Sequence, residues 1–547
     1  MNMKQVFSLT AFASAVMVAV AAPLELIELD PDAKPIRDQR DSRCGVGLGF
    51  AGSLVEGDPV AYHFVSNRTE TAVKFKESGV YFVREWGALT AWKKRMQYMA
   101  LTDPEARAKW LKKDPATAVD PHAVFSFRKE NNIKVLLTIE QWGQVDPLTG
   151  IQTNDIQAVK RAVGEYLQWI VDNDYDDQVA GIELGNETYF HPDPSGVAER
   201  WAQIIPEIRR VMPNVPIGIP LAEYSEGDPD VAAVRNRLLA AGAITSKKAV
   251  GLGLERFNAW NGHFVTTLSN QMHNVTHLIY HFYGGDAAYG CSMSGFGRIA
   301  NFAKAFPEVK GKKIWITEWR ERSDEDNRCH QTFFSTLFKG HYMLLGLSMP
   351  DVEGMNTHSL NCLSGAFYIA RGTGHWLVQW DSAHREYPDL EDTGHPRMYS
   401  GPAGPLFRLF NEALLEHPII LEHGNQSSFG PGHAEWGSAM MYSNWKKHGH
   451  VEWAMLLSPE KDSASIIAVN SNMKPQTLKF KLKGKSPRQA RIRTVSCPPE
   501  RFRTHIIPGE VSPLTETDVK KNLSPDGETL VIEYPACSVQ TVTVPLK

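Results

Sequence analysis

The sequence predicts an α/β protein in which a (β/α)₈ TIM barrel is followed by a smaller C-terminal all-β sandwich domain. The first observation behind this prediction is an alternation of short apolar runs with longer amphipathic segments from about Cys44 to Glu416. The second is a change after Glu416, where short strand-like runs are joined by connections rich in Pro, Gly, Ser and Asn. The third is the length of 547 residues, which is more than one hydrophobic core usually serves.

Eight apolar runs supply the strands of the predicted barrel. They are Gly45–Phe50, Val80–Arg84, Lys134–Ile139, Val179–Gly185, Ile217–Leu221, Thr276–Phe282, Lys313–Thr317 and Asp351–Met355. The segments between them have helical periodicity, and the clearest are Asn154–Val171, Val197–Val211, Thr332–Leu345 and Pro402–Leu415. A doubly wound open sheet would give a similar alternation. The count of eight and the polar residues that follow the strands favour a closed barrel over residues 44–418.

Residues 419–547 are expected to form the β-sandwich domain. Its predicted strands are Val451–Leu457, Ser465–Val469, Thr477–Leu482, Ala490–Val495, Thr529–Tyr534 and Ser538–Val544. The segment before the barrel, residues 22–43, is one candidate for a further strand of this sandwich.

Residues 1–21 are typical of a secretory signal peptide. Lys4 gives a positive start, an apolar run extends from Val6 to Val20, and Ala19-Val20-Ala21 is a suitable cleavage site. The run is too short for a transmembrane helix, and no later run replaces it. We therefore expect a secreted protein, extracellular or periplasmic, with no membrane partner after cleavage. An uncleaved anchor is the alternative.

Six cysteines occur without a C-x-x-C spacing, so a zinc knuckle is not indicated. Export permits disulfides, and two pairs are plausible. Cys497 and Cys537 both lie near the C-terminus, whereas Cys291 and Cys329 would tie two loops on one face of the barrel.

Composition excludes some classes of function. The formal net charge is −4 and the pI is about 6.6, so a basic face and a nucleic-acid partner are not expected. The 19 histidines are scattered and form no recognisable metal motif. The glycine-rich segment after Cys44 resembles part of a dinucleotide-binding fingerprint. It lacks the third glycine at the required spacing and the helix that should follow at once. No metal and no cofactor is therefore implied.

Two glutamates follow strands four and seven of the predicted barrel. Because active-site groups of such barrels come from the carboxyl ends of the strands, Glu187 and Glu318 should point into one mouth. Cleaving a glycosidic bond needs one carboxyl group to protonate the leaving oxygen and a second at the anomeric carbon. Two nearby carboxyls also disfavour double ionisation, which would keep one protonated.

The Asn186-Glu187 and Thr317-Glu318-Trp319 motifs resemble clan A of the retaining glycoside hydrolases. The resemblance implies that Glu187 is the acid/base, that Glu318 is the nucleophile, and that Asn186 contacts the sugar 2-hydroxyl. The order of a barrel and then a β-sandwich resembles the arabinofuranosidase and xylosidase branches of that clan.

The same resemblance implies roles for residues on strands two and six. Arg84 and Tyr283 match the Arg and Tyr that hold the nucleophile ionised, and His281 matches a subsite residue. We expect Glu187 to lack such partners. An alternative is that Glu183, in phase with Glu187 on strand four, pairs with Arg84 inside the barrel and makes Arg84 structural.

Other rim residues have open roles. Glu140 and Glu223 follow strands three and five, where a surface position is expected but a subsite position is the alternative. Trp142, Trp319 and Trp86 are candidate stacking platforms for sugars, and core packing is the alternative for each.

Together these features predict a secreted retaining glycoside hydrolase that acts on a plant or algal polysaccharide or its oligosaccharides. A non-catalytic carbohydrate-binding protein on a barrel scaffold is one alternative. A transglycosylase, in which a sugar replaces water and the same residues act, is another.

Overall fold

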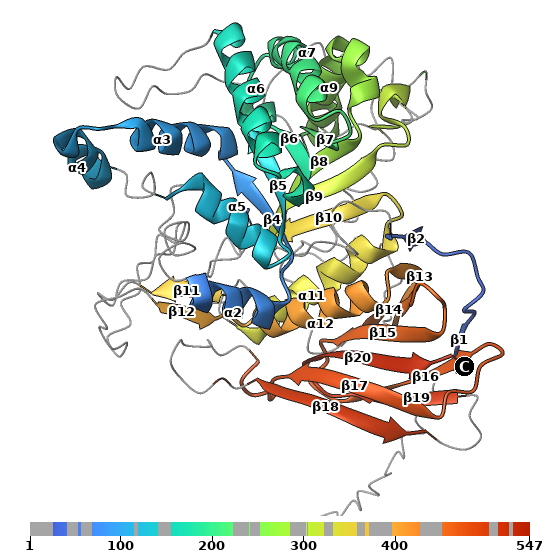
Figure 1. Cartoon of the computed structure of the whole chain (residues 1–547). Coiled ribbons are helices and arrows are strands. Elements are labelled where there is room, and N and C mark those ends of the chain that lie inside the picture. Colours follow the sequence, from blue (N-terminus) through green and yellow to red (C-terminus); the bar gives the residue numbers. More distant parts are fainter. Residues whose placement is uncertain are drawn as a thin grey trace, which may run out of the picture.

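The computed structural model describes most of the barrel and of the domain that follows it (Figure 1). The described residues are 26–40, 53–55, 68–113, 119–140, 155–222, 240, 252–284, 302–303, 305–321, 332–357, 367–370, 397–426, 451–502, 512, 514–523 and 529–546.

Eight parallel strands follow one another in chain order across one sheet, which confirms the (β/α)₈ barrel. They are β3 (Ser53–Val55), β4 (Phe82–Trp86), β5 (Lys134–Ile139), β6 (Val179–Leu184), β7 (Ile217–Pro220), β8 (His277–Gly284), β9 (Lys313–Glu321) and β10 (Val352–Thr357). Seven predicted runs overlap these strands. The first predicted run, Gly45–Phe50, lies outside the described residues.

Helices lie between the barrel strands and cover the outside of the sheet (Figure 1). Those described are α2 (Arg68–Ser78), α3 (Ala88–Ala100), α4 (Pro104–Lys113), α5 (Pro121–Glu130), α6 (Ile156–Asp172), α7 (Pro194–Val211), α9 (Leu252–Thr267), α11 (Phe333–Ser348) and α12 (Gly404–Glu416). Asp-Pro pairs start α5 and α7, where the aspartate side chain accepts a backbone N–H and the proline needs no hydrogen bond.

The C-terminal part consists of two β-sheets. The larger has the order β18-β17-β20-β15-β14-β13-β2, and the smaller has the order β1-β16-β19. The strands are β1 (Leu26–Leu29), β2 (Arg37–Asp38), β13 (Ile419–Gln426), β14 (Val451–Leu457), β15 (Ser463–Asn470), β16 (Gln476–Leu482), β17 (Gln489–Ser496), β18 (Thr515–Asn522), β19 (Thr529–Tyr534) and β20 (Ser538–Pro545). Apolar side chains from both sheets share one core, in which Trp453 meets Phe480 edge-on.

The N-terminal segment joins both of these sheets. β1 pairs in parallel with β16, and β2 pairs with β13. Described segments from before and after the barrel sequence therefore belong to the same β-domain. A further two-stranded sheet, β11 (Phe367–Ala370) with β12 (Arg397–Ser400), lies beside α2.

The barrel and the β-domain share a continuous apolar core. Helices α11 and α12 lie between the barrel sheet and the larger β-sheet (Figure 1). Gly340 of α11 packs on Val469 of β15, so closely that an added Cβ would lie 2.8 Å from Val469 Cγ2. Val469 and Leu456 belong to the same buried cluster as the barrel helices. The face of the larger sheet that carries Val469 and Leu456 therefore packs into the same apolar core as the barrel helices.

Cys497 and Cys537 are neighbours, but both are free thiols. They extend the pairing of β17 with β20, and the Cys497 N–H donates to the Cys537 carbonyl oxygen at 3.1 Å. The Cys537 thiol is directed to the Asn472 carbonyl oxygen at 3.5 Å and to the Met473 sulfur at 3.6 Å. The predicted disulfide is thus not formed in this structure. Cys291 and Cys329 lie outside the described residues.

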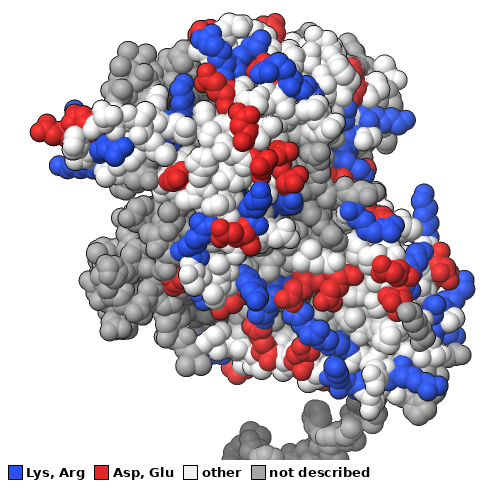
Figure 2. Space-filling model, in the orientation of Figure 1, with Lys and Arg blue, Asp and Glu red and all other residues white. Residues whose placement is uncertain are grey.

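Charged side chains are interspersed on the face seen in Figure 2, where acidic and basic groups alternate over both the barrel and the β-domain. Among the helices in the described ranges, none is both long and apolar enough to cross a membrane.

Candidate active site

The side chains that face into the barrel form an apolar layer beneath a polar one. Alternation along a strand sends every second side chain to the interior. The apolar layer is a separate buried cluster that includes Phe82, Leu136, Ile279 and Trp315. Two residues further along the same strands lie Arg84, Thr138, His281 and Thr317, all buried. The polar layer therefore lies at the carboxyl ends of the strands, where a barrel active site is expected.

Trp315 fills the centre of the apolar layer because two glycines leave room for its ring. A Cβ on Gly181 would lie 2.2 Å from Trp315 Cη2, and one on Gly218 would lie 2.9 Å from Cε3. His277 stacks on the indole at a centroid distance of 3.7 Å. This packing gives the polar layer a rigid floor.

Arg84 connects the barrel interior to Glu318. Its Nε and Nη2 donate to both oxygens of Glu183 at 2.5 and 2.7 Å, and its Nη1 donates to Glu318 Oε1 at 2.6 Å. Burial alone would lower the pKa of Arg84, but Glu183 and Glu318 raise it above its ordinary value. Both predicted partners of Arg84 are therefore present, and the pairing with Glu183 does not replace the pairing with Glu318.

Glu183 is a buried anion that fixes this arginine. Burial would raise its pKa, yet Arg84 and His281 hold the pKa of Glu183 below its ordinary value. The hydroxyl groups of Thr138 and Thr317 donate to its oxygens at 3.2 and 3.3 Å. Because Glu183 is fully buried, it supports the site from below and does not reach a substrate.

A β-bulge in β9 turns Glu318 into the barrel. Tyr280 of β8 pairs with Ile316, but the next residue, His281, pairs with Glu318, so Thr317 is an inserted residue. Thr317 and Glu318 consequently both contact interior groups. Without the bulge, strict alternation would place Glu318 on the outside.

The same bulge turns Trp319 outward, so its prediction as a substrate-binding residue is wrong. The side chain is fully buried, and its ring stacks on Tyr342 of α11 at 4.8 Å. A ring enclosed between a strand and a helix offers no face to a sugar. Trp319 therefore contributes to the core outside the barrel.

Glu187 lies on a sharp turn immediately after β6. Its backbone is left-handed, with φ of 48°, which is uncommon for a residue with a side chain and is a form of strain found at functional sites. The 3₁₀ turn η3 (Thr188–Phe190) follows, and Tyr189 Oη donates to Glu187 Oε1 at 2.9 Å. We expected Glu187 to lack such a partner, and Tyr189 corrects that expectation.

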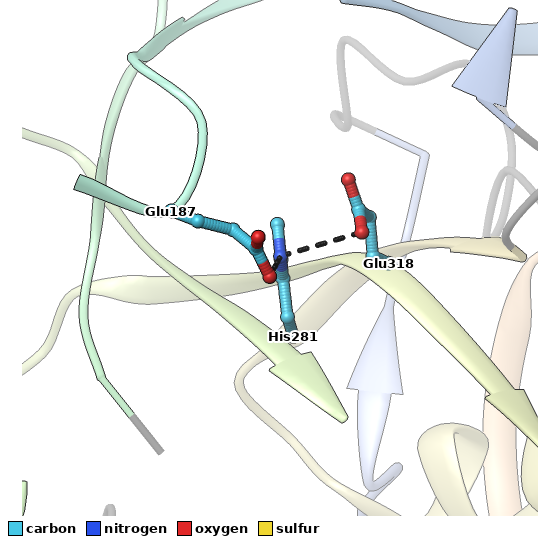
Figure 3. A group of neighbouring side chains, drawn as sticks. All are labelled: Glu187, His281 and Glu318. Atoms are coloured by element: carbon cyan, nitrogen blue, oxygen red, sulfur yellow. Dashed lines mark hydrogen bonds and ion pairs between the residues drawn. The ribbon is translucent and has the colours of Figure 1, made fainter. Parts of the chain in front are cut away.

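His281 lies between the two glutamates (Figure 3). Its Nδ1 is 3.1 Å from Glu187 Oε1 and 3.6 Å from Glu318 Oε2. Burial opposes a charge on the ring, but Glu318, Glu183 and Glu187 together raise the pKa of His281 to about 9. The imidazolium can then donate from Nδ1 to Glu187 and from Nε2 to Thr317 Oγ1 at 3.0 Å.

The side chains of Glu187, His281 and Glu318 point toward one another (Figure 3), and one donor atom from each lies within 4.8 Å of the others. Such a set could hold a metal ion. However, Glu318, Glu183 and Glu187 favour the protonated form of His281, and a metal would have to displace that proton to gain a lone pair on the ring. The geometry is better suited to proton transfer and nucleophilic attack.

The two glutamates differ in their surroundings. Glu318 is buried, Arg84 holds its Oε1, and its Oε2 lies 3.6 Å from His281 Nδ1, on the side of Glu187 (Figure 3). The Glu187 side chain is 28% exposed, and Tyr189 and His281 both contact its Oε1. An ionised carboxylate beside an arginine suits a nucleophile, and a solvent-accessible carboxyl group suits a proton donor.

The remaining predicted residues are placed as follows. Asn186 Oδ1 accepts from Arg84 Nη2 at 2.8 Å, so it adjoins the site. Tyr283 lies two residues after His281 on β8, and the structure describes its backbone alone. Trp142 and Glu223 lie outside the described residues. Trp86 ends β4 and is 38% exposed.

Glu140 is half-buried, between the surface position and the subsite position that the sequence left open. It follows β5 in the inward phase, above Thr138, and its Oε2 is buried with no hydrogen-bond partner in the described part of the chain. Burial raises the pKa of Glu140 to about 7. Tyr189 is the residue of the site that sequence reasoning missed. Its only signal is its place two residues after Glu187.

Known proteins resemble this chain in fold and not in sequence. No family model matches the sequence, and a search of curated proteins found no match. Among solved structures, the α-L-arabinofuranosidase from Thermotoga maritima in complex with arabinose has a TM-score of 0.59 at 12% identity, over 95% of this chain and 100% of that one. A family 51 α-L-arabinofuranosidase from Bifidobacterium longum has a TM-score of 0.59 at 13% identity, over 95% and 99%. The whole architecture, barrel and β-domain together, is shared with these proteins.

Proposed function

We propose that this protein is a secreted retaining glycoside hydrolase that cleaves a plant or algal polysaccharide, or oligosaccharides cut from one, by double displacement. The observation that carries this proposal is the pair of carboxyl groups at the ends of β6 and β9. Oxygens of Glu187 and Glu318 lie within 4.8 Å of one another. Carboxyl groups of retaining enzymes stand roughly 5–5.5 Å apart, and those of inverting enzymes roughly 6.5–9.5 Å apart. The shorter spacing supports retention.

The surroundings of each group support its role. Glu318 Oε2 attacks the anomeric carbon while Arg84 keeps the carboxylate ionised and oriented through Oε1. Glu187 gives its proton to the leaving oxygen. In the second step Glu187 takes a proton from water, and the water oxygen displaces Glu318 from the sugar. The bond to Glu318 forms as the bond to the leaving oxygen breaks, and it breaks in the second step as the bond to the water oxygen forms.

The first sugar to test is α-L-arabinofuranose. Solved structures that share the whole architecture are α-L-arabinofuranosidases, and one of them holds arabinose. Their identity to this chain is 12–13%, so xylan, mannan, β-glucan and agar-type galactans belong in the same panel.

The experiment compares wild type with Glu187→Gln and Glu318→Gln on p-nitrophenyl glycosides and on these polysaccharides. Glu199→Gln, an exposed glutamate on α7, is the matched control. We expect Glu318→Gln to lose at least about 10³-fold in kcat/KM and Glu199→Gln to retain wild-type activity. ¹H NMR of the first product should show the anomeric configuration of the substrate.

Four outcomes would contradict the proposal. A first product of inverted configuration would exclude double displacement. Full activity in both glutamine variants would exclude these residues as the catalytic pair. Binding of a glycan without cleavage would favour the carbohydrate-binding alternative, and transfer to a second sugar in place of water would favour the transglycosylase.

Export is part of the proposal. The apolar run of residues 6–20 and the Ala19-Val20-Ala21 site support it. We expect protein recovered outside the cytoplasm to begin at Ala22, as measured by intact mass. A mass that includes residues 1–21 would indicate an uncleaved anchor.

A further inference from the structure

Two exposed aromatic side chains flank the candidate site. Among the Trp and Phe residues that the structure describes, Phe190 is 61% exposed and Trp86 is 38% exposed, and the others are more buried. A single exposed aromatic residue on a protein surface is ordinary. Here each of the two follows a strand that supplies the site, β4 for Trp86 and β6 for Phe190. Their shared position at the barrel mouth therefore needs an explanation.

Phe190 belongs to the same turn as Glu187. Its backbone N–H donates to the Glu187 carbonyl oxygen at 3.0 Å. Its ring lies 4.9 Å from the ring of Tyr189, whose hydroxyl group holds Glu187 Oε1. Tyr189 is itself packed edge-on against His281 at 6.3 Å. The position of the Phe190 ring is thus fixed relative to Glu187 by both backbone and side-chain contacts.

We propose that Phe190 is the platform on which the sugar of the leaving group stacks. The inference rests on the proposed function, because it takes Glu187 as the acid. The acid must lie beside the leaving oxygen, so the leaving sugar occupies the Glu187 side of the mouth. An exposed ring on that side can cover the apolar C–H face of a sugar ring. Trp86 ends β4, the strand whose Arg84 holds Glu318, and β5 separates that strand from β6.

A partition experiment isolates this subsite from the donor sugar. The donor is p-nitrophenyl α-L-arabinofuranoside, or the p-nitrophenyl glycoside that the wild type hydrolyses fastest. Released nitrophenol counts every glycosyl-enzyme formed, and free sugar counts those resolved by water. The amount of nitrophenol minus the amount of free sugar gives the transfer to an added acceptor, which is either xylotriose or methanol. Because every variant forms its intermediate from the same donor, the ratio of transfer to hydrolysis reports acceptor binding.

We expect Phe190→Ala to lower transfer to xylotriose about 10-fold relative to hydrolysis, as the loss of one aromatic contact predicts, and to leave transfer to methanol unchanged. Phe190→Tyr and Phe190→Trp should retain transfer to xylotriose. Val531→Ala, at an apolar residue on β19 that is 49% exposed, is the control. The kcat/KM for an oligosaccharide should fall in Phe190→Ala by the same factor as the transfer ratio.

The outcomes separate this inference from the proposed function. If the wild type hydrolyses the donor and the transfer ratio is the same in Phe190→Ala, the subsite is wrong and the proposed function stands. An equal fall with xylotriose and methanol would indicate a disturbed Glu187 and would also overturn the subsite. If the wild type cleaves no glycoside, the proposed function and the subsite proposal both fail.

Discussion

At the scale of single residues, burial and neighbouring charges decide which carboxyl groups of the barrel are ionised. Glu140 and Glu183 both face into the barrel, but Arg84 hydrogen-bonds Glu183 and not Glu140. As a result the pKa of Glu183 lies below its ordinary value, and burial raises the pKa of Glu140 to about 7. Such a difference between neighbouring acids indicates that the surroundings of each group, rather than its residue type, set its ionisation.

Glu140→Gln should stabilise the protein at pH 8. The unfolded chain ionises Glu140 from about pH 4.5, whereas the folded chain keeps it protonated until about pH 7, so folding loses stability across this window. A glutamine does not titrate, and the gain should reach about 1–3 kcal/mol at pH 8 and vanish below about pH 4.5. Urea unfolding at both pH values measures it. A lower stability at pH 8 would show that the carboxylate has a partner in the folded state.

His281 should give a pH dependence of the same sign at higher pH, because its pKa is also raised by folding. Its pKa in the folded protein is raised to about 9, from about 6.5 in an unfolded chain. The stability it contributes is therefore fully present below about pH 6.5 and is lost as the pH rises through about 9. Relative to His281→Gln, the wild type should lose about 3 kcal/mol of unfolding free energy between pH 6 and pH 10. Parallel stability profiles for the two proteins would contradict a charged His281.

At the scale of elements, the barrel interior depends on close contact between strands. Gly181→Ala would place a methyl group 2.2 Å from the Trp315 ring, and the strand cannot move away without breaking the sheet. We expect a loss of about 3 kcal/mol in unfolding free energy. Trp315→Phe removes the atoms that clash, so Gly181→Ala should cost much less in that background. A double-mutant cycle by urea unfolding tests this, and additive effects would show that the two residues do not interact.

The elements also show how far the sequence alone could predict the structure. The barrel strands were predictable because each is a short apolar run covered on both faces. β18, whose residues are TETDVKKN, was missed because it is an edge strand with exposed, mostly polar side chains and therefore has no apolar pattern. Glu187 and Glu318 were predictable from their places after strands.

The orientation of Trp319 was not predictable from the sequence. It depends on the inserted residue Thr317, and a bulge is set by the pairing of β9 with its neighbours rather than by local sequence. The partial burial of Glu140 was not predictable from the sequence either, because it depends on side chains from other strands.

At the scale of the whole molecule, a buried hydrogen-bonded cluster joins the barrel to the β-domain. Glu452 of β14 is fully buried between His341 of α11, at 2.8 Å, and His423 of β13, at 2.6 Å. Ser471 adjoins His341 at 3.0 Å, which reproduces the connectivity of a hydrolase triad. All the same, Ser471 is fully buried, so a substrate cannot reach its hydroxyl group. The cluster therefore connects the two parts of the molecule.

This connection, together with the shared apolar core, predicts that the barrel and the β-domain unfold as one unit. Removing Glu452 takes a hydrogen-bond partner from each of two buried imidazoles, so Glu452→Ala should cost about 2–5 kcal/mol. Glu460→Ala, an exposed glutamate of the same domain, should cost almost nothing. In calorimetry we expect a single transition in the wild type, and in Glu452→Ala a single transition at a lower temperature. Two separate transitions in the wild type would show that the domains are independent, because helices α11 and α12 would then keep their fold without the sheet that covers them.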